Sequence, residues 1–354
     1  MSLSERLIHD AEGLNSGVWP FTPGEFITEV ERFFTRSHAA IPAIDPGRWR
    51  LRVQGLVIRS SAFGIADLKR LPRREVTATL VCAGLRRSEL LEVRRLPGEL
   101  PWGPEAAGTG CWEGYSLSDL LRELGIDERA RYVEFTGLDA VERRGSVFGF
   151  GGSIELAKAL EEDVLLADTL NGAPLPPAHG FPMRAVVPGW IGARSVKWLG
   201  TITLLDAPSQ NYFQRKAYRV QREINPDDPR DVSSGRMLDG VPLNSVIVTP
   251  TNDQRLEAGE IDVFGWAMGS FGRPIVRVEI SSDGEHWLAA TLREHGEWTW
   301  TFWQGSVRLP AGRHVLMVRA EDDTGAVQPA SLEESWNVRG YCTNAWHRVR
   351  IFVH

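Results

Sequence analysis

Two hydrophobic patterns follow one another along this chain. In the first, Val76–Val81 is an apolar run typical of a strand buried on both faces, and Trp49–Val53 and Arg131–Phe135 predict further strands. Ser116–Gly125 instead places its leucines along one face of a helix, and Ser153–Glu161 predicts a second, shorter helix. This mixture predicts an α+β fold for the first part of the chain.

The helix predicted at 116–125 carries signals at both ends. Ser116 and Asp119 resemble the start of a capping box, in which a side-chain oxygen accepts a hydrogen bond from the first turn. Gly125 suits the position after the last turn, where a left-handed backbone is common. We therefore expect a helix with sharply defined ends.

The second part of the chain has short strand-like runs at close spacing and no long helical pattern. The runs are Ser245–Thr249, Glu260–Trp266, Ile275–Ile280 and His314–Ala320. Ser282–Glu285 has the composition of a hairpin turn between two of them. The pattern predicts an all-β sandwich of immunoglobulin-like type. The polar, turn-rich segment Asn225–Gly235 is the expected linker, so the predicted domains are residues 1–235 and 236–354.

Composition fits a globular protein and limits its partners. The chain has 354 residues, 42% of them hydrophobic and 24% charged, which is enough for two domains. Its formal net charge of −6 argues against nucleic acid or an anionic membrane surface as the main partner. No apolar run is long enough to cross a bilayer, and the first ten residues lack a signal-peptide pattern. We expect a cytoplasmic protein, or a periplasmic one if a leader has been removed.

Cys82 stands at the end of the buried strand, before a turn-forming Ala83-Gly84 and the pair Arg86-Arg87. Fixed positive charge beside a thiol favours the thiolate, which is the form that binds metals or attacks. The alternative is a buried and inert thiol, and the spacing alone favours this alternative. With Cys111 and Cys342 the cysteine count is odd and small, which indicates free thiols in a reducing compartment.

Basic side chains gather in two loop-like segments. Arg32–His38 sets an arginine and a histidine beside paired aromatics, which suits a site loop or, equally well, a solvated loop. The Pro- and Gly-rich segment 171–198 carries His179, Arg184, Arg194 and Lys197. Arginines on a rigid backbone suit phosphate or another oxyanion, and the alternative is a twisted edge strand with solvated charges. Trp102, in a loop from Leu96 to Gly110, is either a lid over a pocket or a plug in the core, and the plug is the commoner role.

Several of these segments, in this order, resemble the sulfite oxidase family of molybdenum-cofactor enzymes over nearly the whole chain. The matching stretches are Phe34–His38, Cys82–Ser88, His179–Arg184, Val187–Gly189, Gly192–Leu199, Trp336–Gly340 and Asn344–Val349. The resemblance implies an α+β domain that binds molybdopterin, followed by an immunoglobulin-like domain that forms a homodimer. It implies oxidation of sulfite to sulfate, with the electrons passed to a separate acceptor such as a cytochrome.

The resemblance also assigns roles to residues. Cys82 would be the protein ligand of molybdenum, a role that suits a soft thiolate. The cofactor would be held by Phe34, Thr35, Arg36, Ser37, His38, Asp139, His179, Arg184, Ser195, Val196 and Lys197. The substrate pocket would be formed by Arg36, Arg87, Arg339, Tyr218 and Trp102. We expect no haem and no flavin, because the chain lacks a haem-attachment motif and any attached cytochrome-like domain.

Two positions depart from the family pattern and keep other substrates open. Ser37 and Leu85 stand where the family usually has asparagine, which removes hydrogen-bonding capacity near the cofactor. The alternatives are a nitrate reductase-like enzyme, an oxidoreductase for another small oxyanion or sulfur compound, and a binding module without cofactor. Arg339 counts against the nitrate reductases, in which this position is typically not arginine.

Overall fold

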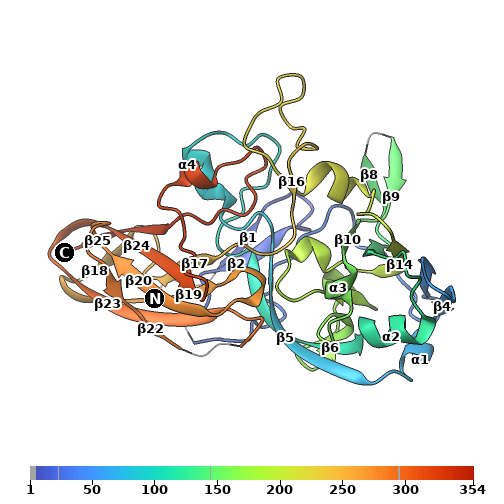
Figure 1. The fold of residues 1–354 in the computed structure, drawn as a ribbon. Coiled ribbons are helices and arrows are strands. Elements are labelled where there is room, and N and C mark those ends of the chain that lie inside the picture. Colours follow the sequence, from blue (N-terminus) through green and yellow to red (C-terminus); the bar gives the residue numbers. More distant parts are fainter. Residues whose placement is uncertain (1–4, 23, 144, 294–295) are drawn as a thin grey trace.

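Two sheet-rich parts lie side by side in the computed structural model, which describes residues 5–22, 24–143, 145–293 and 296–354 (Figure 1). The expected α+β fold followed by a β-sandwich is confirmed. The first four residues, on which the expectation about a leader partly rests, lie outside the described residues. Within the described ranges, no helix is both long and apolar enough to span a bilayer.

The first part is built on two sheets. One has the order β10-β7-β14-β3-β4, and its strands are β3 (Leu51–Gly55), β4 (Ser61–Phe63), β7 (Tyr132–Gly137), β10 (Gly151–Glu155) and β14 (Leu199–Leu205). The other has the order β12-β11-β6-β5, with β13 added beside β11, and its strands are β5 (Arg73–Val81), β6 (Ala107–Ser116), β11 (Leu165–Leu170), β12 (Ala173–Pro174) and β13 (Arg184–Val186). Short ladders join β1 (Glu5–Ile8) to β2 (Ser16–Trp19), β8 (Val141–Arg143) to β9 (Ser146–Phe148), and β15 (Arg219–Val220) to β16 (Arg236–Met237).

Helical elements are short among the described residues. They are α1 (Ile65–Leu68), α2 (Leu117–Leu124), α3 (Leu156–Ala159), α4 (Leu332–Ser335) and the tighter or wider turns η1 (Arg87–Glu92), η2 (Pro177–His179), η3 (Gly192–Arg194), η4 (Phe213–Ala217) and η5 (Ser270–Gly272).

Two expectations about helices need correction. The helix predicted at 153–161 is wrong in its first turn, because Gly151–Glu155 pairs with β7 as a strand and only Leu156–Ala159 is helical. Ser116 does not cap α2, since its hydroxyl instead lies 2.9 Å from that of Ser118. At the other end Gly125 directly follows the helix, and its N–H donates to the last turn. Its φ of 76° is positive, as expected, but its ψ of 140° is extended rather than left-handed helical.

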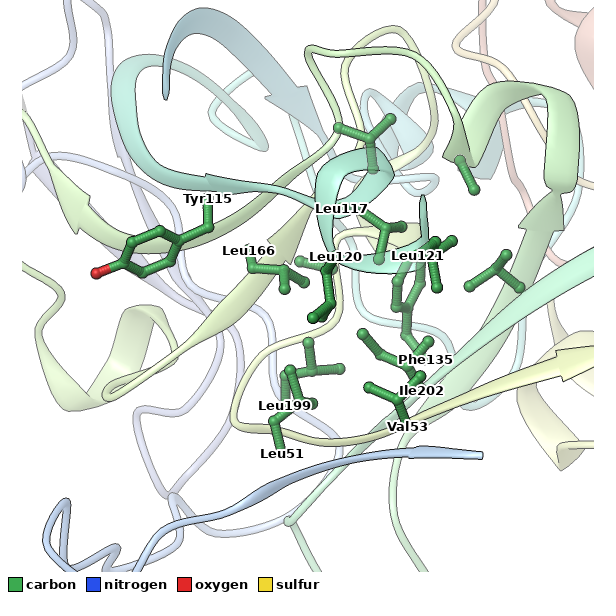
Figure 2. Packing of buried hydrophobic residues seen from close by; sticks show 14 of the residues in the cluster. Leu51, Val53, Tyr115, Leu117, Leu120, Leu121, Phe135, Leu166, Leu199 and Ile202 are labelled. Carbon is green, nitrogen blue, oxygen red and sulfur yellow. The ribbon is translucent and has the colours of Figure 1, made fainter. Parts of the chain in front are cut away.

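The leucine face of α2 forms one side of the main core. Leu117, Leu120 and Leu121 are fully buried, and Figure 2 shows them above the sheet that carries Phe135 and Ile202. Each buried leucine contributes about 1.5–3 kcal/mol relative to an exposed one. The packing therefore follows the hydrophobic periodicity from which the helix was predicted.

The second part is a sandwich of two sheets around its own apolar core. One sheet has the order β17-β19-β23-β22, with β17 (Asn244–Thr249), β19 (Gly259–Met268), β22 (Thr291–Leu292) and β23 (Thr301–Leu309). The other has the order β18-β25-β24-β20-β21, with β18 (Gln254–Leu256), β20 (Ile275–Ser281), β21 (Leu288–Ala289), β24 (Gly312–Asp322) and β25 (His347–Val353). Each predicted strand-like run lies within one of these strands.

The two parts are joined by buried polar contacts as well as by apolar packing. The N–H of Thr79 on β5 donates to the carbonyl of Trp298 at 2.9 Å, and its hydroxyl accepts from the N–H of Trp300 at 2.9 Å. Beside this interface, within the second part, His347 accepts from the N–H of Ile247 at Nδ1, at 3.0 Å, and its Nε2 lies 3.8 Å from Oε1 of Glu89 in the first part. Burial, with nearby Arg86, holds the pKa of His347 well below its usual value.

This buried histidine predicts acid sensitivity. As the pH falls from 7 to 5.5, the unfolded chain protonates His347 near its ordinary pKa while the folded chain does not, so stability is lost. The loss is about 1.4 kcal/mol per pH unit once the pH is below that ordinary pKa. His347→Gln should therefore give a shallower fall of melting temperature with pH than the wild type.

His286→Gln is the matched control, because this histidine is largely solvent-exposed. It should follow the wild-type profile. Parallel profiles of melting temperature against pH for wild type and His347→Gln would contradict a role of His347 in acid sensitivity.

Candidate functional site

Cys82 lies where β5 ends and the chain turns. Its N–H donates to the carbonyl of Ala106 at 2.9 Å, and its own carbonyl accepts from the N–H of Leu85 at 3.0 Å. The sulfur accepts from the N–H of Gly84 at 3.4 Å. The side chain is 8% exposed and lines a cavity. The turn therefore presents the sulfur to that cavity.

This cavity has an empty volume of about 720 Å³, which includes space open to solvent. Its wall contains most of the residues predicted from the sequence: Phe34, Arg36, Ser37, His38, Cys82, Asp139, His179, Arg184, Ser195, Val196, Lys197 and Tyr218. They come from the loop before β3, the end of β5, the loop after β7, the segment from η2 to β14 and the position directly after η4 (Phe213–Ala217). Residues far apart in sequence thus converge on one space.

Buried positive charge is the main electrostatic feature of the cavity. Arg184 donates to the carbonyls of His179 at 3.0 Å and Ser195 at 2.8 Å, and Lys197 donates to the hydroxyl of Ser37 at 2.8 Å. Burial lowers the pKa of Arg184 to about 9, and burial with nearby Arg184 holds the pKa of Lys197 well below its usual value. Among the described residues neither cation forms an ion pair. Isolated buried cations are costly, so a bound anion would stabilise them.

Asp139 adds a hydrogen-bond acceptor to the same wall. Its Oδ1 accepts from the N–H of Phe150 at 2.9 Å, and burial raises the pKa of its carboxyl. A cationic set beside one carboxyl group matches a ligand that has an anionic end and N–H donors. The residues present therefore fit a pterin that carries a phosphate.

His38 links Arg36 to Tyr218. Arg36 Nη2 lies 3.2 Å from His38 Nδ1, and His38 Nε2 lies 2.9 Å from the hydroxyl of Tyr218. Because guanidinium only donates, Nδ1 accepts, and the neutral ring carries its proton at Nε2. Burial, with nearby Arg36, keeps the pKa of His38 well below its usual value, and burial raises that of Tyr218 to about 12. Tyr218 therefore stays protonated and can donate toward the cavity.

Arg87 folds back over the Cys82 turn. Its Nε donates to the carbonyl of Arg339 at 2.9 Å, and its Nη1 donates to that of Leu100 at 3.0 Å. A Cβ added at Gly84 would lie 2.9 Å from the guanidinium, so only glycine leaves room for Arg87 in this position. The guanidinium also lies over the ring of Tyr341, 5.0 Å from its centre.

Arg339 reaches this place from a loop of the second part of the chain. Asn337 holds the loop closed by donating to the carbonyl of Tyr341 at 2.7 Å, and the N–H of Cys342 donates to the carbonyl of Ala83 at 2.7 Å. The guanidinium of Arg339 is bound to Glu99, with Nη1 and Oε1 2.6 Å apart. Arg87 and Arg339 are two of the three arginines predicted to face substrate, and they meet beside the Cys82 turn with a carboxylate between them. Unlike Arg36, neither of them lies on the cavity wall.

Two further residues expected at the site are not on the cavity wall. Thr35 is not on the cavity wall, because its backbone pairs with that of Ser16. Trp102 is fully buried, with its ring against His9 and Phe34, so it is a plug in the core rather than a cavity wall.

Arg86 does not support a thiolate at Cys82 in the way expected. Its Nε and Nη2 each lie 2.7 Å from an oxygen of Glu89, and its Nη1 donates to Asn244 at 2.7 Å. Its charge is therefore paired, and it ties the first part of the chain to β17.

Two residues of the site were missed by reading the sequence. Tyr341 stacks on Tyr218 with ring centres 5.3 Å apart, and its place directly after the matched Arg339-Gly340 was an available signal. Glu99 had no such signal, because it lies in a loop whose composition says nothing of its partners.

Two family models match the chain. One is the oxidoreductase molybdopterin binding domain, over residues 38–213, and the other is the Mo-co oxidoreductase dimerisation domain, over residues 236–354. Among solved structures, the sulfane dehydrogenase SoxCD of Paracoccus pantotrophus superposes with a TM-score of 0.81 at 26% identity, covering 97% of this chain and 87% of that chain.

Curated relatives match over most of the chain. The mitochondrial sulfite oxidase of Homo sapiens is 39% identical over 341 residues, which is 93% of this chain and 62% of that protein. The sulfite oxidase of Arabidopsis thaliana is 35% identical over 346 residues, 92% of this chain and 88% of that protein. An inducible NADH nitrate reductase of Glycine max is 35% identical over 354 residues, 93% of this chain and 40% of that protein. The chain thus spans less than two thirds of the human relative.

The contact between Gly84 and Arg87 can be tested by Gly84→Ala. The new methyl group should push the guanidinium away from its carbonyl partners and cost about 1–3 kcal/mol, as overpacking does. The measurement is the free energy of unfolding in urea, with the melting temperature as a second readout.

Gly47→Ala should change stability little, because its added Cβ would approach only the Asp45 carboxylate. In an Arg87→Gln background, Gly84→Ala should cost less than in the wild type, since the clashing group is gone. Equal costs in both backgrounds would exclude Arg87 as the cause.

Proposed function

This chain belongs to the sulfite oxidase family of molybdopterin oxidoreductases, and from this premise we propose that it oxidises sulfite to sulfate at a molybdenum centre. One observation carries the proposal: Cys82 opens onto a cationic cavity, and Arg87 and Arg339 converge beside the same turn. The oxidation adds one oxygen from water to sulfite and releases two electrons and two protons.

In this proposal the cavity holds the cofactor. Arg184 and Lys197 neutralise its phosphate, Asp139 accepts from the N–H groups of its pterin, and Cys82 is the protein ligand of the metal. Among the described residues, no three side chains of His, Cys, Asp or Glu gather into a metal site. One thiolate from the chain therefore suits a metal whose other ligands come with the cofactor. The molybdenum cofactor, when bound, supplies oxygen-atom transfer and takes up the two electrons.

The chain's own groups bind and orient the substrate. Arg36, Arg87 and Arg339 supply fixed N–H donors for a small oxyanion. Tyr218 is held by His38 and keeps its proton, so it donates a hydrogen bond to the same anion. Trp102 is enclosed in the core and does not line the cavity, so we do not include it in this set.

A related sulfur compound is the second candidate substrate. The structural likeness to a sulfane dehydrogenase favours it, as does the placement of the two departures from the family pattern. The hydroxyl of Ser37 accepts a hydrogen bond from Lys197, and Leu85 is buried among apolar residues. Neither side chain can replace the hydrogen bonds of the asparagine amide that the family usually has there. Nitrate is a weaker candidate substrate because Arg339 lies beside Arg87, and this position is typically not arginine in the nitrate reductases.

The proposal extends to partners and organisation. The second part, which we divide from the first after residue 235, forms a homodimer. A separate acceptor such as a cytochrome takes the electrons. The three cysteines are free thiols, which suits the cytoplasm as the compartment.

The function is tested by a steady-state assay of sulfite and nitrate with artificial electron carriers. We expect turnover with sulfite, none above background with nitrate, and about one molybdenum per chain, because the cofactor carries the reaction. A chain that is produced with cofactor supply but contains no molybdenum would refute the enzymatic proposal. Turnover of nitrate alone would reassign the substrate.

Cys82→Ser tests the metal ligand. Serine keeps the size of the side chain but removes the soft sulfur, so turnover should fall to background while the melting temperature stays near that of the wild type. Cys111→Ser is the matched control, because this thiol lies on β6 away from the cavity, and it should keep full activity. Unchanged activity in Cys82→Ser would exclude the ligand role.

A further inference from the structure

Glu99 lies between Arg87 and Arg339, and these three side chains form what we call the arginine cluster. Its Oε1 lies 2.6 Å from Arg339 Nη1, and its Oε2 lies 3.6 Å from Arg87 Nη2. Arg230, from the segment before β16, has its Nη2 3.9 Å from the same Oε1 of Glu99. The side chains of Glu99 and Arg339 are each 12% exposed, and that of Arg87 is 5% exposed. These contacts are therefore largely shielded from solvent, where ion pairs are strong.

The cluster adjoins the Cys82 turn. The guanidinium of Arg87 packs on Gly84, and the carbonyl of Leu100, next to Glu99 in sequence, accepts from Arg87. Burial is the main cause that raises the pKa of Tyr218 on the cavity wall, and the charge of Glu99 adds to it while Arg36 and Arg87 oppose it. Glu99 therefore lies close enough to influence the wall onto which Cys82 opens.

Glu99 divides the cations of the site into two groups. Arg184 and Lys197, which line the cavity beside Cys82, form no ion pair among the described residues, although Asp139 lies on the same wall. Arg87 and Arg339 share one. An anion entering beside Cys82 therefore meets arginines whose charge is already partly neutralised.

We propose that Glu99 is a specificity-determining residue, an internal counter-ion that competes with oxyanions for Arg339 and Arg87. The inference rests on the proposed function, since it assigns the role of Glu99 in binding substrate and product. Two unpaired arginines would hold a dianion tightly, and sulfate has the same charge as the fully ionised substrate. The carboxylate weakens the binding of both, which lets the product leave.

The alternative role for Glu99 is purely structural. It would then hold the arginines in the orientation that binds the anion, and its loss would weaken binding. The two roles predict opposite signs for the same substitution.

The experiment is calorimetric titration of the molybdenum-loaded enzyme with sulfate, for wild type and Glu99→Gln. The variant keeps the shape and a hydrogen-bond acceptor but removes the charge. We expect its dissociation constant for sulfate to fall about tenfold or more, as removal of a close competing charge implies. Sulfate should inhibit its turnover at correspondingly lower concentration. Unchanged or weaker sulfate binding would overturn the proposal.

Two further variants support the test. Glu123→Gln removes the same charge from an exposed ion pair with Arg70 and should leave sulfate binding unchanged. Glu99→Asp keeps the charge but shortens the side chain, so it should bind sulfate more tightly than the wild type and less tightly than Glu99→Gln. If Glu99→Gln does not fold, equal sulfate binding in Glu99→Asp and wild type overturns the proposal.

The titration separates this inference from the proposed function, because sulfate binding needs no turnover. Tighter sulfate binding in an enzyme that does not oxidise sulfite would refute the function alone. Sulfite oxidation with unchanged sulfate affinity would refute the role of Glu99 alone.

Discussion

The position of Arg87 is the constraint on which the site depends. Three separate stretches of the chain supply its partners: the turn after β5, the loop before β6 and the loop before β25. Two of them make room for it only because they contain glycine, since a Cβ at Gly340 would lie 2.8 Å from Arg87 Cγ. The guanidinium therefore fixes the C-terminal loop against the Cys82 turn, and that contact places Arg339, Tyr341 and Glu99.

Charge is distributed around this contact in a way that suits two different ligands. A cofactor that stays bound gains from cations that are hydrogen-bonded but not ion-paired within the chain, because its own anionic end can supply the counter-charge. A substrate that must be exchanged at every turnover gains from weaker attraction. The unpaired Arg184 and the paired Arg339 meet these two needs within one site.

Much of this arrangement could be predicted from the sequence, and the reasons for success and failure are physical. The leucines of α2 and the apolar run of β5 reflect local periodicity, so they were placed correctly. The converging cations were found because Arg184 and Lys197 stand in a Pro- and Gly-rich segment that excludes a helix. Cys82 was placed by the turn that follows it.

The errors concern side chains whose partners are distant in sequence. Trp102 packs against His9, which directly follows β1. Arg86 donates a hydrogen bond to Asn244 of the sandwich, and Glu99 forms an ion pair with Arg339. Residues 153–155 pair with β7 as part of a strand, although their sequence favours a helix. The ion pair of Arg86 with Glu89, three residues away, is a local signal that the sequence did offer. The other choices depend on distant partners, so sequence patterns could not reveal them.

The loop that carries Arg339 lies near the end of the chain. In this loop the backbone N–H of Cys342 donates a hydrogen bond to the carbonyl of Ala83, far earlier in the sequence. During synthesis the Cys82 turn leaves the ribosome long before this loop does. Until this loop is made, Arg87 has the carbonyl of Leu100 but lacks those of Arg339 and Gly340, and one side of the turn stays uncovered. The order of translation therefore leaves a period in which the nascent chain has its thiol but not the segment that later covers it.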